Sequence, residues 1–153
     1  MKNHFFKLRA LTILVFAEAT MASVCAQEAQ WLTDKAKALE KAKAENKAVL
    51  MDFTGSDWCG WCIKMKKEIL DSKEFMTYAA KNLVLLEVDF PNAKEQSAEL
   101  KTQNEELKKQ YGVDGFPTFV LINKDGKQLW KEVGYVEGGP GAFIAKLEGF
   151  KNH

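Results

Sequence analysis

Two cysteines separated by two residues, Cys59 and Cys62, lie where the sequence changes from a strand pattern to a helix pattern. Residues 48–53 before them form a compact apolar run with one acid inside it, which is typical of a buried strand. Residues 63–70 after them carry apolar side chains at helical spacing. Because the turn-like residues 54–57 end the strand, we predict that Cys59 lies at a strand-to-helix junction, near the helix N-terminus.

This position favours redox chemistry at the cysteine pair. The thiolate is the nucleophile in disulfide exchange, and the positive end of a helix dipole stabilises a negative sulfur. Cys59 is therefore predicted to attack a partner disulfide, and Cys62, one helical turn further in, to displace the resulting mixed disulfide. The two-residue spacer lets the two sulfurs meet, so the pair can cycle between dithiol and disulfide.

Three other uses of such a cysteine pair are zinc binding, haem attachment and a purely structural disulfide. A zinc site needs four ligands, and the only histidines are His4 and His153, close to the two chain ends. Covalent haem attachment needs a histidine directly after the second cysteine, where this chain has Ile63. A purely structural disulfide over so short a loop constrains the unfolded chain very little. The sequence thus predicts no metal site and no cofactor.

The rest of the chain alternates predicted helices and strands. Helices are expected over residues 33–46, 72–81 and 93–111 and after the glycine-rich segment 138–141, and strands over residues 83–89, 119–122 and 128–133. The last two strands flank a turn, residues 123–126, that favours a hairpin. This order predicts an α/β fold with a central mixed β-sheet flanked by helices. The length of 153 residues suits a single domain.

The first 26 residues have the pattern of a secretory signal peptide. Three basic residues precede a short apolar run, and small residues follow, with cleavage favoured after Ala26. The apolar run is far shorter than the roughly 20 residues that span a bilayer, so no stable membrane span is expected after cleavage. We therefore predict a signal peptide over residues 1–26, a folded domain over residues 27–153, and a periplasmic or secreted protein, in which the cysteine pair can persist as a disulfide.

Removal of the signal peptide also changes the charge and the cysteine count. It takes away three basic residues and Glu18, which leaves 19 basic and 20 acidic residues and a net charge of −1. Cys25 leaves with it; a lipid anchor on Cys25 is the weaker alternative, because Val24 suits the preceding position poorly. The basic residues alternate with acids along the chain, which argues against a nucleic-acid partner.

Two motifs together resemble the thioredoxin superfamily. The first is Trp58-Cys59-Gly60-Trp61-Cys62 after a strand that ends in Asp52-Phe53, and the second is Gly115-Phe116-Pro117-Thr118 before a later strand. The resemblance runs from about residue 31 to residue 150. It is strongest to secreted bacterial thioredoxin-like proteins related to the soluble C-terminal domain of the Dsb thiol:disulfide interchange reductase.

The resemblance implies roles for residues around the cysteines. Pro117 would be a cis proline whose loop packs beside the pair and offers its backbone to client chains, with Phe116 tuning the sulfur environment and contacting the client. Trp58, Gly60 and Trp61 would form an apolar rim around Cys59. Such a protein would exchange disulfides with client proteins and would need an upstream thiol-disulfide electron donor or acceptor.

Asp52 is the third site residue that the resemblance implies. An acid in a buried strand has a raised pKa, which would let Asp52 pass protons to or from Cys62. Three departures from typical thioredoxins bear on this role. The segment from Asp52 to Cys59 is one residue longer, the lysine that often accompanies the acid is aligned with Leu85, and Trp61 replaces a proline between the cysteines.

Three functions remain open on the sequence. The leading one is an extracytoplasmic thiol-disulfide oxidoreductase acting on client proteins through the cysteine pair. A redox-linked binding or chaperone-like module would use the same apolar rim with little turnover. A dedicated thiol reductant in cytochrome maturation would use the same pair, and the direction of electron flow is left open.

Overall fold

The computed structural model describes residues 29–151 of the chain. The predicted signal peptide and Cys25 lie outside these residues, so export, cleavage and the start of the folded domain stay predictions. Among the described residues, no helix is both long and apolar enough to cross a membrane.

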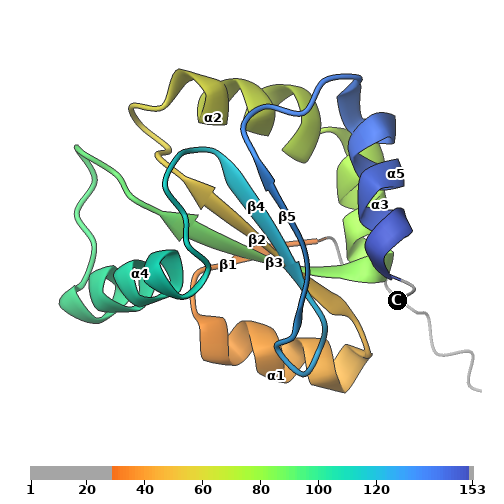
Figure 1. The fold of residues 1–153 in the computed structure, drawn as a ribbon, viewed down its shortest axis with the longest axis horizontal. Helices are drawn as coiled ribbons and strands as arrows, with labels where there is room; N and C mark the ends of the chain where they lie inside the picture. The colour runs from red at the N-terminus through yellow and green to blue at the C-terminus, as the bar shows by residue number, and fades with distance from the viewer. Residues whose placement is uncertain (1–28, 152–153) are drawn as a thin grey trace, which may run out of the picture.

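The core of the molecule is a five-stranded mixed sheet (Figure 1). Its strands are β1 (Trp31–Leu32), β2 (Ala48–Thr54), β3 (Leu83–Asp89), β4 (Thr118–Ile122) and β5 (Gln128–Val133), in the order β1-β3-β2-β4-β5. The first three strands are parallel and the last two are antiparallel to their neighbours. Every residue of β2 is buried, as its apolar run predicts for a central strand.

Helices cover both faces of the sheet, as predicted. They are α1 (Lys35–Glu45), α2 (Gly60–Met65), the π-helical turn η1 (Lys66–Leu70), α3 (Lys73–Asn82), α4 (Ala98–Gln110) and α5 (Gly139–Lys151). Figure 1 shows α1 and α4 on one side and α2, α3 and α5 on the other. Each side has its own hydrophobic core, one centred on Phe75, Phe119 and Phe143 and the other on Phe53 and Leu107.

Helix starts follow local capping, and one of them differs from the prediction. The Asp34 and Ser72 side chains accept hydrogen bonds from the first turns of α1 and α3, close to the predicted starts. The helix expected from residue 93 begins at Ala98 instead, because the Ser97 side chain caps it by accepting from the backbone N–H of Leu100. Residues 91–97 form a loop that leads into the site region.

The hairpin lies where the sequence predicts it, and the last helix begins at Gly139, within the glycine-rich segment 138–141. Gly126 has a φ of 87° in the turn between β4 and β5, a left-handed conformation that favours glycine. Its backbone N–H donates to the carbonyl of Asn123 at 2.9 Å. Two-residue β1 was not predicted; it pairs with β3 through Trp31 and Leu32.

Candidate active site

Cys59 and Cys62 form a disulfide at the start of α2, with their Cα atoms 5.2 Å apart. Cys59 is the N-cap of α2, and its sulfur accepts a hydrogen bond from the backbone N–H of Cys62 at 3.2 Å. Cys59 is 8% exposed and Cys62 is 3% exposed. In the reduced protein the same N–H and the helix dipole would stabilise a Cys59 thiolate, so the geometry suits Cys59 as the attacking sulfur.

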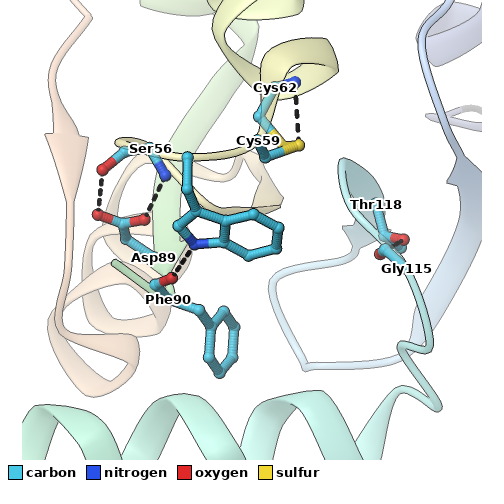
Figure 2. The surroundings of a disulfide bond; sticks show 8 residues. Ser56, Cys59, Cys62, Asp89, Phe90, Gly115 and Thr118 are labelled. Atoms are coloured by element: carbon cyan, nitrogen blue, oxygen red, sulfur yellow. Dashed lines mark hydrogen bonds between the residues drawn. A yellow bond between two sulfur atoms is a disulfide. The ribbon is translucent and has the colours of Figure 1, made fainter. Parts of the chain in front are cut away.

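The loop before Cys59 is fastened to the end of β3 by two contacts. The Asp89 carboxylate accepts from the backbone N–H of Ser56 at 2.9 Å and from its hydroxyl at 2.6 Å. The indole N–H of Trp58 donates to the carbonyl of Phe90 at 2.7 Å. Figure 2 shows the Ser56–Asp89 contact on one side of the cysteine pair and the turn from Gly115 to Thr118 on the other.

A third contact comes from Asp57, between Ser56 and Trp58. Its carboxylate accepts from the backbone N–H groups of Asn92 and Ala93 at 2.9 and 2.7 Å. These bonds hold the pKa of Asp57 below its usual range, because they favour the ionised form. Residues 56, 57 and 58, which we call the clasp, thus each bind the segment 89–93. The segment from Asp52 to Cys59, which is one residue longer than in typical thioredoxins, is therefore held in place by the clasp.

An aromatic rim surrounds the pair. The ring of Phe116 lies 5.8 Å from that of Trp58 in an edge arrangement and 5.2 Å from that of Phe90. On the other side, the ring of Trp61 lies 5.7 Å from that of Tyr135. Trp58 and Trp61 are 47% and 59% exposed, which leaves large apolar faces open to a partner chain.

Two of these aromatic residues were missed by the sequence reasoning. Phe90 directly follows β3, and Tyr135 follows Gly134 after β5, so each stands beside a strand end. Both could have been found from the sequence, because each is an aromatic residue just past the carboxyl end of a predicted strand. Gly60 is exposed between Cys59 and Trp61, with open space where a Cβ would stand.

The loop with Pro117 reaches the cysteine motif through Phe116, whose ring contacts that of Trp58. The peptide bond between Phe116 and Pro117 is cis. The Thr118 hydroxyl donates to the carbonyl of Gly115 at 2.8 Å, closing the turn drawn in Figure 2. The carbonyl of Pro117 accepts from the backbone N–H of Gly134 at 2.8 Å, which ties this loop to the end of β5.

Asp52 lies in the middle of β2 and is 5% exposed. Its Oδ1 atom is buried without a hydrogen-bond partner. Burial raises the pKa of Asp52 to about 8, and the neighbouring Glu87 and Asp89 carboxylates act in the same direction, whereas Lys66 opposes them. The predicted upward shift is therefore present.

Leu85, the residue aligned with the lysine that often accompanies this acid, does not stand directly opposite Asp52. The register pairs Asp52 with Glu87, whereas Leu85 pairs with Leu50 and belongs to the hydrophobic core. An acid rather than an apolar residue therefore neighbours Asp52. Within residues 29–151, no group of three or more His, Cys, Asp and Glu side chains could hold a metal ion.

Comparisons with known proteins agree with this geometry. The Thioredoxin-like domain family matches residues 35–151. The disulfide bond reductase DsbH of Chlamydia pneumoniae is 45% identical over 125 residues, which cover 82% of this chain and 74% of DsbH. A solved structure of a DsbH oxidoreductase matches with a TM-score of 0.77 at 38% identity, over 95% of both chains. The oxidised C-terminal domain of Neisseria meningitidis DsbD shares the fold, with a TM-score of 0.57 at 24% identity over 76% of this chain and 91% of that domain. The chain therefore belongs to the thioredoxin-like family, and within that family it is a thiol-disulfide oxidoreductase.

Proposed function

We propose that this protein reduces disulfides in client proteins outside the cytoplasm. The observation that carries the proposal is the Cys59–Cys62 disulfide at the N-cap of α2, beside the loop of Pro117. The reductive direction is supported by the 45% identity to a disulfide bond reductase. The location outside the cytoplasm is supported by the signal-like pattern of residues 1–26.

The reaction runs in two exchanges. The Cys59 thiolate attacks one sulfur of a client disulfide; a mixed disulfide forms, and the other client sulfur leaves as a thiolate that takes a proton from water. Cys62 then loses its proton and attacks the Cys59 sulfur, which releases the second client sulfur. Two electrons have passed to the client, and the protein is left with the Cys59–Cys62 disulfide. An upstream dithiol donor must reduce it again.

We assign the other predicted site residues to this cycle. Asp52 would accept the proton that Cys62 loses, because its buried carboxyl has a proton affinity close to that of a thiol. Trp58, Gly60, Trp61, Phe116 and Pro117 would contact the client chain around its cysteine. A binding module or a reductant dedicated to cytochrome maturation would use the same surface, but no contact in the described residues favours either over general reduction.

The test is reduction of insulin disulfides by the protein with a chemical dithiol as donor. Cys62→Ala should trap clients as mixed disulfides at Cys59, because the displacing sulfur is gone. Cys59→Ala is the matched control and should trap none, since Cys62 is 3% exposed. Absence of turnover in the unaltered protein, together with absence of trapped adducts, would overturn the proposal.

A further inference from the structure

Asp52 faces a second carboxyl across the β2–β3 pair. The parallel register sets Asp52 opposite Glu87 and Thr54 opposite Asp89. Since side chains alternate along a strand, Asp52 lies on the same face of the sheet as Leu50, and Glu87 on the same face as Leu85. Leu50 and Leu85 belong to one core, the core that also contains Met65 and Ile69. Asp52 and Glu87 therefore stand side by side under α2 and η1.

No basic side chain neutralises this pair by direct contact. Among the described residues, the ion pairs include neither Asp52 nor Glu87. Lys66 follows Cys62 by one helical turn, and both line a hollow of about 270 Å³. The Lys66 ammonium, however, is bound to Asp71 at 2.6 Å. Its attraction for Asp52 is therefore shared with another carboxylate.

We propose that Glu87 is a positioning residue that tunes Asp52 as the proton acceptor of Cys62. The inference rests on the proposed function, because it concerns the second exchange of that cycle. In that step the Cys62 thiol gives its proton to the Asp52 carboxylate, and the resulting thiolate attacks the Cys59 sulfur. Glu87 acts only through Asp52: its negative charge makes the Asp52 carboxylate hold a proton more strongly.

Proton affinity decides whether Asp52 can do this. A carboxylate at its ordinary pKa of about 4 is a poor acceptor for a thiol with a pKa of about 8.5. Burial, the Glu87 charge and, to a smaller extent, Asp89 raise the pKa of Asp52 to about 8 against the opposing charge of Lys66, a value that nearly matches the thiol. Glu87 is itself half-buried, and burial and Asp89 raise its pKa, with a smaller rise from Asp71, while Lys66 and Lys94 lower it.

The second exchange can be followed alone with an aromatic disulfide such as Ellman's reagent. Reduced protein releases one coloured thiolate when Cys59 attacks and a second when Cys62 displaces the mixed disulfide, so stopped-flow absorbance separates the two phases. We expect the pH midpoint of the second phase to fall by about one unit in Glu87→Gln, since removal of a neighbouring like charge lowers the pKa of Asp52. Glu87→Lys should shift it further in the same direction. The first phase should not change.

Two variants separate this role from a structural one. Asp52→Asn should abolish the pH midpoint of the second phase. Adding Glu87→Gln to Asp52→Asn should cause no further change in the pH profile of that phase. Glu106→Gln, at an exposed position of α4, is the matched control and should behave like the unaltered protein. An unmoved midpoint in both Glu87 variants, or an equal shift in the Asp52→Asn background, would overturn the inference while insulin reduction still succeeds. Failure of insulin reduction in the unaltered protein would instead refute the proposed function.

Discussion

Replacing Asp52 by Asn should make the stability of the oxidised protein less dependent on pH. The pKa of Asp52 is raised from 3.8 to about 8 in the folded chain, so the folded state binds a proton that the unfolded state releases between these two values. Stability from this group is thus fully present below pH 3.8 and is lost as the pH rises towards 8. Integrated from pH 4 to pH 7, the loss is about 4 kcal/mol, at about 1.4 kcal/mol for each pH unit.

Asn keeps the shape of the side chain and cannot ionise, so Asp52→Asn should escape this loss. The assay is urea denaturation of both oxidised proteins at pH 4 and pH 7, followed by tryptophan fluorescence. The free energy of unfolding of the variant, relative to the unaltered protein, should rise by about 4 kcal/mol between the two pH values. Any cost of burying an amide that does not depend on pH cancels when the two pH values are compared. Glu87 is present in both proteins, so its presence does not distinguish them. If the free energies of unfolding of the two proteins changed equally with pH, the conclusion that Asp52 is buried and protonated would be refuted.

Three further changes test the clasp and the core. Gly55→Ala places a Cβ 2.4 Å from the Trp58 ring, so insulin reduction should fall, whereas the control Gly149→Ala in α5, where a Cβ meets nothing within 4 Å, should leave insulin reduction unchanged. Asp57→Asn should lower the melting temperature at pH 7, and the difference should vanish as the pH falls through the lowered pKa of Asp57, because the fold stabilises the ionised carboxylate. A difference that does not depend on pH would contradict this. Phe75→Ala removes a fully buried ring that packs 5.7 Å from Phe143, and should lower the free energy of unfolding by about 3–5 kcal/mol in urea titrations.

The elements that sequence predicts well here are those with a long local signal. Strand β3 spans the seven residues predicted, five of them apolar, and α1 is within two residues of the predicted bounds. Two-residue β1 has no periodicity to detect, and it exists only because β3 offers it an edge. The start of α4 could have been predicted from Ser97, a good N-cap residue, followed by Glu99 in the first turn. The polar composition of residues 93–111 does not by itself show where the helix begins.

The site divides in the same way between local and distant information. The cysteine pair at a helix start and the cis proline are written in short motifs, and both are confirmed. The residue that stands opposite Asp52, Glu87, cannot be identified from a short motif, because its position depends on how two strands separated by a helix align. Only the register of the parallel pair decides which β3 residue stands opposite Asp52: it sets Glu87 there, whereas Leu85, two residues earlier on the same face, stands opposite Leu50.

The end of β3 is therefore as important to the site as the cysteine motif. Glu87 stands beside Asp52 under α2, Asp89 holds Ser56, and the carbonyl of Phe90 holds the indole of Trp58. All three depend on the same β2–β3 register: Glu87 is paired with Asp52 by that register, and the loop that Asp89 and Phe90 fasten continues directly from β2. If Asp52 takes up the Cys62 proton as we propose, a substitution that displaces the end of β3 should alter both this proton transfer and the aromatic rim, although it touches neither cysteine.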